Sequence, residues 1–316
     1  MMQATPQSPW DNQNIVLVSA DPSSFPEEVL TRLERRQWVT SLRTGRINEA
    51  FRALREGMCT FLLIHDTPEM PASQILRAQI ADPLAIITPT IVVAHPAHQQ
   101  EIALLKDMGA PDIVESPVNP SAFITSFEWL LRKWSQGNFR KLYLARRQYI
   151  ENQQVVFGKT LTALRTESDI STLATASLAR TMVHQTDLKS IEKLLLGALK
   201  EHPRSLTIIL SLIEFYLRAS MPETSLKILG ATRKNFGNPR LLFPDQIQAH
   251  LMLNQVKESI PLLEAMVRED YSRKSAQIFL ARCLYAEGHL ERFQKVIENQ
   301  ILAADDFKNR WNKVAG

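Results

Sequence analysis

The 316-residue sequence predicts a doubly wound α/β domain followed by an all-α domain made of repeated helix pairs. Three observations lead to this prediction. Short apolar runs alternate with longer amphipathic segments from Asn14 to Trp134, which is typical of a parallel sheet covered by helices. The second half shows a period of 34 residues instead. Residues 1–136 carry 11 Lys and Arg against 15 Asp and Glu, a net −4, whereas residues 137–316 carry 26 against 18, a net +8.

The first half is predicted to hold five strands that alternate with five helices in one flavodoxin-like domain. The expected strands are residues 15–19, 39–42, 61–64, 90–94 and 112–115. The expected helices are residues 26–37, 47–56, 72–80 and 97–108, and a fifth that begins at Pro120. In this fold, functional side chains collect at the carboxyl ends of the strands, so a site is expected there.

At these strand ends, four landmarks resemble the receiver domain of bacterial response regulators. Ser19–Pro22 (SADP) follows the first strand, where receivers have an acidic run before proline. Ile64–Asp66 (IHD) closes the third strand, like the strand that carries the phospho-accepting aspartate. Gly109-Ala110 precedes the fifth strand, and Ser116-Pro117 follows it where receivers have Lys-Pro.

The resemblance implies a receiver that has lost most of its phosphorylation chemistry. Receivers hold Mg²⁺ with two acids after the first strand and with the acceptor aspartate, because this hard cation prefers oxygen ligands. A hydroxyl on the fourth strand and a lysine after the fifth then bind the phosphoryl group. Only Asp66 is clearly present here, as a vestigial phosphoacceptor that we do not expect to be phosphorylated; an alignment shifted by one residue would keep Asp21 as one acid. The degenerate receiver positions are Ser19, Ala20, Asp21, Ala94 and Ser116.

No catalytic residues, metal site or cofactor are predicted, and the chain is not expected to be an enzyme. The sequence has no glycine-rich phosphate loop, no Ser/His/Asp arrangement and no Cys/His cluster with metal-ligand spacing. His65 is interpreted as a packed or solvated side chain. His95 and His98 lie three residues apart, but without a third ligand type nearby they do not predict a metal site. Cys59 and Cys283 are expected to be reduced core residues.

The segment between the two halves is helical in pattern from Phe139 to Leu164. It suits a dimerising coiled coil, and hence a homodimer, or an N-terminal helix packed on the repeats. The second interpretation is favoured, because the apolar spacing is too irregular for sustained heptads. The expected limits are 1–13 for a disordered N-terminus, 14–136 for the receiver-like domain, 137–171 for the connector, 172–307 for the repeats and 308–316 for a C-terminal tail.

Residues 172–307 can be written as four 34-residue units that begin at Thr172, Leu206, Arg240 and Lys274. In this register, small or apolar residues recur at the seventh, eighth, twentieth and twenty-fourth positions, which two packed helices would bury. Ile191 holds the twentieth position of the first unit, and Leu229 and Leu263 hold the twenty-fourth position of the second and third units. The pattern resembles the tetratricopeptide repeat (TPR). The third unit departs from it and is expected to be distorted. Its unusual residues are Gln246 and His250 at apolar positions, and Pro244 and Pro261 inside expected helices.

The TPR resemblance implies a superhelix whose concave face is lined by the first helix of each unit. The mixture of polar and apolar side chains expected there favours a peptide or protein segment over a small metabolite. The groove candidates, at the ninth and twelfth positions of the units, are Arg180, Val183, Glu214, Leu217, Gln248, Leu251, Arg282 and Tyr285.

These features favour a cytoplasmic, non-enzymatic bacterial signalling adaptor that binds protein partners through TPR repeats. A histidine kinase, a sigma or anti-sigma factor, or a motility, pilus or biofilm component would suit it. No secretory signal is apparent, and no apolar run approaches the about 20 residues of a membrane span. One alternative is a phosphorylation-dependent response regulator with Asp66 as phosphoacceptor and the repeats as output. A second is nucleic-acid binding through the basic half, which the dispersed basic residues do not favour.

Overall fold

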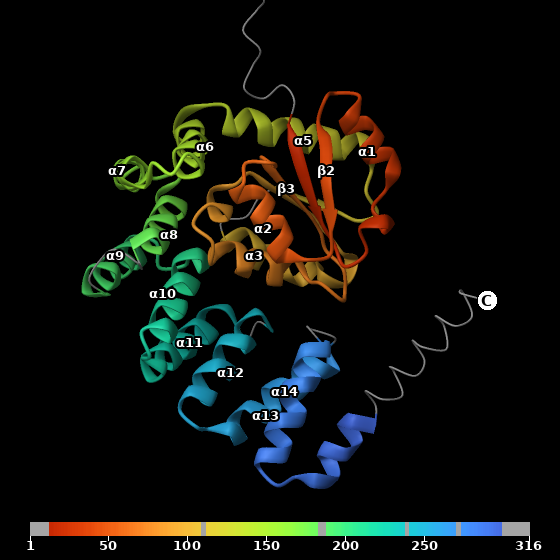
Figure 1. The fold of residues 1–316 in the computed structure, drawn as a ribbon, viewed down its shortest axis with the longest axis vertical. Coiled ribbons are helices and arrows are strands. Elements are labelled where there is room, and N and C mark those ends of the chain that lie inside the picture. The colour runs from red at the N-terminus through yellow and green to blue at the C-terminus, as the bar shows by residue number, and fades with distance from the viewer. Residues whose placement is uncertain (1–12, 109–111, 183–187, 238–239, 270–272, 299–316) are drawn as a thin grey trace, which may run out of the picture. The chain divides into compact units, whose positions relative to one another are not determined.

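The chain divides into two compact units, residues 1–219 and residues 220–316. The predicted disordered N-terminus, apart from Gln13, and the predicted C-terminal tail lie outside the residues that can be described. The computed structural model describes residues 13–108, 112–182, 188–237, 240–269 and 273–298 (Figure 1).

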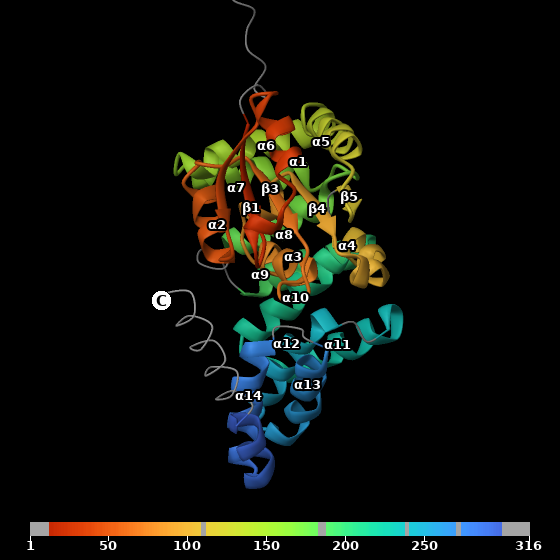
Figure 2. The same ribbon diagram turned by 90° about the vertical axis from the view of Figure 1, so that its right-hand side faces the viewer.

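The first unit is built on a parallel sheet of five strands (Figure 2). The strands are β1 (Asn14–Val18), β2 (Val39–Thr44), β3 (Phe61–His65), β4 (Thr90–Ala94) and β5 (Asp112–Glu115). Their order across the sheet is β2-β1-β3-β4-β5. The apolar, β-branched runs of β1, β3 and β4 are buried almost throughout, as expected for central strands covered on both faces. β2 alternates between exposed and half-buried residues, which fits its place at the edge.

Helices cover both faces of this sheet (Figure 1). They are α1 (Glu27–Glu34), α2 (Ile47–Arg55), α3 (Ala72–Ile80), α4 (Ile102–Asp107) and α5 (Pro120–Trp134). α1 packs against α5, whereas α3 contacts both α2 and α4. The Asn119 side chain accepts the N–H groups of Ser121 and Ala122, which begins α5 with proline at its first position. The alternation of strands and helices predicted from the sequence is thus confirmed.

An all-helical region follows the sheet, as the sequence predicted, and its first part belongs to the first unit. These helices are α6 (Gly137–Ile150), α7 (Gln154–Leu164), α8 (Ser171–Met182), α9 (Leu188–Glu201) and α10 (Leu206–Arg218). α7 packs on α8, and α10 contacts α3 and α4 of the α/β layer. Arg146 of α6 is buried and donates to the carbonyls of Thr60 (2.7 Å) and Cys59 (3.3 Å), just before β3. The connector is therefore anchored to the sheet as well as to the helices.

The second unit continues the helices. It contains α11 (Pro222–Phe236), α12 (Phe243–Met252), α13 (Val256–Arg268) and α14 (Arg273–Ala286), and residues 290–298 are also helical. Phe243, Leu263 and Leu284 lie in its core. Pro244 occupies the first turn of α12, where proline is tolerated, and Pro261 lies inside α13 without ending it. Over the residues that can be described, no helix is long and apolar enough to cross a bilayer.

Candidate functional site

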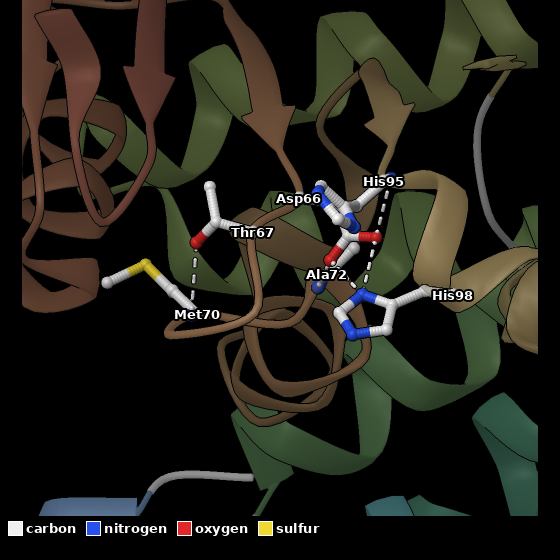
Figure 3. A network of polar contacts seen from close by, with 6 residues as sticks. All are labelled: Asp66, Thr67, Met70, Ala72, His95 and His98. Carbon is white, nitrogen blue, oxygen red and sulfur yellow. Dashed lines mark hydrogen bonds and ion pairs between the residues drawn. The ribbon is translucent and has the colours of Figure 1, made fainter. Parts of the chain in front are cut away.

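Asp66 follows β3 directly and lies at the carboxyl edge of the sheet, beside the loop that follows β4 (Figure 3). His65 pairs with Val93 in the parallel register, so the residues after both strands meet at this edge. The N–H of Asp66 donates to the Val93 carbonyl (2.9 Å) and extends the ladder by one residue. The side chain of Asp66 is only 1% exposed. A carboxylate at this depth needs donors around it.

Two backbone N–H groups supply such donors to Asp66. The Ala72 N–H donates to Oδ1 (2.8 Å), and the His95 N–H donates to Oδ2 (2.9 Å). Ala72 is the first residue of α3, where N–H groups have no partner within the helix. The carboxylate also lies at the positive end of the helix dipole. Asp66 therefore joins the ends of β3 and β4 to the start of α3.

The imidazole of His98 is the third group on this carboxylate. Its Nδ1 lies 3.0 Å from Oδ1 and 2.9 Å from Oδ2 of Asp66. His98 comes from the 3-10 segment Pro96–Glu101 between β4 and α4, and its side chain is 9% exposed. An ionised carboxylate only accepts hydrogen bonds, so Nδ1 carries the proton in this contact. The Nδ1–H bridges both oxygens (Figure 3).

The loop between Asp66 and α3 is closed by its own hydrogen bonds. The Met70 N–H donates to Oγ1 of Thr67 (3.1 Å) and to the Thr67 carbonyl (3.2 Å), and the Thr67 N–H donates to the Met70 carbonyl (3.3 Å). Thr67 is buried, whereas Pro68 and Glu69 at the tip are exposed. The short loop thus holds Ala72 at a fixed place relative to Asp66.

Ser19 and His65 form a second polar contact at the same edge. The Ser19 hydroxyl donates to the Asp21 carbonyl (3.1 Å) and lies 3.1 Å from Nδ1 of His65. Because the single hydroxyl proton is used on the carbonyl, Nδ1 of His65 is the donor to Ser19. Burial lowers the pKa of His65, although Asp66 opposes this effect. The rings of Phe25 and His65 pack nearly perpendicular to each other (centroids 5.4 Å apart). His65 is therefore a packed neutral side chain near neutral pH.

The remaining receiver-like positions do not converge on Asp66. The exposed Asp21 carboxylate accepts the N–H of Ser23 (3.0 Å), and hydrogen bonds from Ser23 lower the pKa of Asp21. Ala20 is exposed, and Ala94 is buried with its carbonyl accepting the Ser116 N–H (3.0 Å). The carboxylate of Asp21 thus caps the 3-10 turn Pro22–Ser24 instead of facing Asp66.

The histidines that the structure describes do not assemble a metal-ligand cluster. The rings of His95 and His98 lie 5.7 Å apart, and Nδ1 of His98 faces Asp66. Across the described part of the chain, no group of three or more His, Cys, Asp or Glu side chains could hold a metal ion. Cys59 and Cys283 are buried and free.

In the first unit, the groove candidates from the repeats are used internally. Arg180 is buried; its Nε donates to the Ile80 carbonyl (3.2 Å) and its Nη2 pairs with Oε2 of Glu214 (2.6 Å). Leu217 is buried as well, because α10 packs on the α/β layer. The structure therefore places Arg180 and Leu217 inside the unit, where the sequence predicted a lined groove, whereas Glu214 is half-buried. Val183 lies outside the described residues.

In the second unit, the candidates are more open. Gln248 and Arg282 are exposed, Leu251 is half-buried, and Tyr285 is 64% exposed. The Arg282 guanidinium lies over the ring of Phe279, and the ring of Tyr285 contacts that of Phe293. Gln248 and Leu251 lie on α12, and Arg282 and Tyr285 lie on α14.

The contact that sequence reasoning missed is the one between His98 and Asp66. The two residues are 32 positions apart, and no local pattern connects them. The only available signal was topological, since neighbouring parallel strands end at one edge.

No protein-family model, curated protein or solved structure matches the chain.

Proposed function

We propose that this protein is a non-enzymatic signalling adaptor. Its α/β part is a receiver-like domain held in one state without phosphorylation, and its helical part is a TPR-like array that binds protein partners. The observation that carries the proposal is the saturation of the Asp66 carboxylate by Ala72, His95 and His98. A receiver needs this group open and beside a cation.

A phosphoryl group would have to displace these donors. Each oxygen of Asp66 already accepts a backbone hydrogen bond, and both face Nδ1 of His98. A permanent imidazole donor in place of a transient phosphate would keep the β3 and β4 loops in one arrangement.

The helical part supports the binding role through its periodic burial. The 34-residue register assigns positions 7, 8, 20 and 24 of each unit to the helix–helix core. The buried residues at these positions are Leu178, Ala179, Ile191, Leu195, Leu212, Ile213, Ser225, Leu229, Gln246, Ile247, Ser259, Leu263, Leu280 and Ala281. Stacked helix pairs of this kind expose long surfaces suited to protein segments.

Phosphorylation of Asp66 is tested by incubating the full chain with Mg²⁺ and acetyl phosphate and measuring its intact mass. A receiver known to be phosphorylated under these conditions is the positive control. The expected result is no phosphoryl adduct on this protein. His98→Ala is the informative variant, since it frees one face of the carboxylate while leaving Asp66 in place. An adduct on the wild type that disappears in Asp66→Asn would replace the adaptor with a phosphorylation-dependent regulator.

Residues 165–316 alone do not form a suitable test protein, because they cut through the first compact unit. Ser177 donates to the Pro83 carbonyl (2.6 Å), and Arg180 donates to the Ile80 carbonyl. Partner capture therefore uses the full chain.

A further inference from the structure

A groove on the first unit lies away from the Asp66 site, over helices α7, α8 and α9. α8 contacts both of the other helices and forms the floor between them. The groove has a volume of about 760 Å³, and ligand sites in proteins commonly measure about 300–1,000 Å³. Its walls come from the end of α7 and from one side of α9.

The floor is one face of α8. Ser171, Thr175, Leu178 and Met182 lie three or four residues apart, so they line up along the helix. This face differs from the ninth and twelfth repeat positions that the TPR resemblance assigns to a concave groove. Leu178 and Met182 make one end apolar, and methionine adapts its shape to varied apolar partners. The Ser171 hydroxyl contacts Nε2 of His202 (2.7 Å) and ties the other end to the residue after α9.

The rim of the groove is basic. Arg165 stands on the α7 side and Lys193 on the α9 side, and both are exposed. The adjoining hollow on α9 shares Lys193 and adds two more lysines. The opposing acids are Glu201 and Glu192, and Glu192 accepts the Tyr216 hydroxyl (2.7 Å). The surplus of positive charge favours an acidic occupant.

The chain's own C-terminal segment does not have the complementary charge. Residues 299–316 contain three basic and two acidic side chains. A second protein with an excess of Asp and Glu complements the rim better.

We propose that the α7–α9 groove binds an acidic peptide segment of a partner protein, with one or two large apolar side chains of that segment placed over Leu178 and Met182. Carboxylates of the segment pair with Arg165 and Lys193. The hydroxyl of Thr175 on the floor can bond to the peptide backbone. This inference rests on the proposed adaptor function and specifies the site and the chemistry of the partner.

Two matched glycines allow a clean test. Gly197 on the α9 wall and Gly230 on α11 are both exposed helical residues, and an added Cβ would meet no atom within 4 Å at either. Gly197→Trp fills the groove, whereas Gly230→Trp puts the same side chain elsewhere. Lys193→Glu reverses a rim charge without adding bulk. Circular dichroism confirms that each full-length variant is folded.

The probe is a fluorescein-labelled synthetic peptide in which Glu and Leu alternate, with binding followed by anisotropy. Two further peptides replace Glu by Lys or Leu by Ala. The Glu/Leu peptide should bind the wild type and Gly230→Trp with equal affinity. Its affinity for Gly197→Trp and for Lys193→Glu should be at least about tenfold lower. Both altered peptides should bind the wild type at least about tenfold more weakly than the Glu/Leu peptide.

Equal binding of the Glu and Lys peptides would overturn the proposal, as would absence of binding by the Glu/Leu peptide. If a single-stranded oligonucleotide binds the wild type but not Gly197→Trp, the groove is instead a nucleic-acid site. If the Glu/Leu peptide binds but tolerates Gly197→Trp, this groove is not its site and the adaptor function stands. An aspartyl phosphate at Asp66 would remove the adaptor function without affecting the peptide result.

Discussion

Arg180 of α8 and Glu214 of α10 form an ion pair with Nη2 and Oε2 2.6 Å apart, although 34 residues separate them. They occupy the ninth positions of the first two units in the 34-residue register predicted from the sequence. Arg180 also donates to the carbonyl of Ile80, the last residue of α3, whose first N–H is held by Asp66. α3 is thus fixed to the strand ends at one terminus and, through Arg180, to helix α8 at the other.

Replacing Arg180 should therefore destabilise the first unit. Arg180→Met is expected to lower the free energy of unfolding by about 3 kcal/mol, because it strips a donor from a buried carbonyl and from Glu214. Arg218, whose side chain is 51% exposed, pairs with the same carboxylate (2.7 Å). Arg218→Met should cost about 1 kcal/mol or less. Urea unfolding followed by circular dichroism compares the two, and equal losses would contradict the anchoring role of Arg180.

Asp66 and His98 should be energetically coupled. Asp66→Asn alone should cost about 1–3 kcal/mol, since the side-chain NH₂ would face a backbone N–H. A double-mutant cycle of Asp66→Asn with His98→Asn is expected to give an interaction energy of about 1–3 kcal/mol. The cycle of Asp66→Asn with Arg218→Met is the control and should be additive within about 0.5 kcal/mol. Additivity in both cycles would show that the His98 contact contributes nothing.

His65 should make the protein less stable in mild acid. Burial lowers its folded-state pKa below the ordinary 6.5, with His95 acting in the same direction and Asp66 and Asp21 opposing. The unfolded chain then binds the proton more tightly, so stability present above about pH 6.5 is lost as the pH falls toward the folded pKa. His65→Asn keeps an N–H for Ser19 and removes the titration.

The measurement is the difference in unfolding free energy between the wild type and His65→Asn. As the pH falls from about 8 to about 5, the wild type should lose more stability than His65→Asn, so this difference should decrease. A difference independent of pH would mean that His65 titrates alike in both states.

The two cysteines should report separately on the two units. Burial raises the pKa of Cys59 to about 11 and also raises the pKa of Cys283. Both thiols should resist a disulfide reagent at neutral pH, because the reactive species is the thiolate and neither side chain is accessible. Since Cys59 belongs to the first unit and Cys283 to the second, Arg180→Met should speed labelling of Cys59 only. Equal acceleration at both sites would show that the units open together.

Local sequence patterns were enough to predict the features that recur along the chain. Alternating apolar runs and amphipathic segments located the strands and helices of the sheet, because burial on both faces and helical periodicity are local properties. The 34-residue register predicted Ile191, Leu229 and Leu263 at core positions, and all three are buried. The pattern of strands also identified Asp66 as the carboxylate at the end of the third predicted strand.

Which side chains meet depends on how distant segments pack, and this is seen only in the folded chain. Asp66 acquires His98 because the loop after β4 folds back over the end of β3, and no pattern in the sequence encodes that turn. Arg180 is buried because α8 and α10 pack on the α/β layer, so a position predicted to line a groove became an internal anchor. Side-chain periodicity depends on neighbours in the chain, whereas ion pairs and grooves depend on neighbours in space.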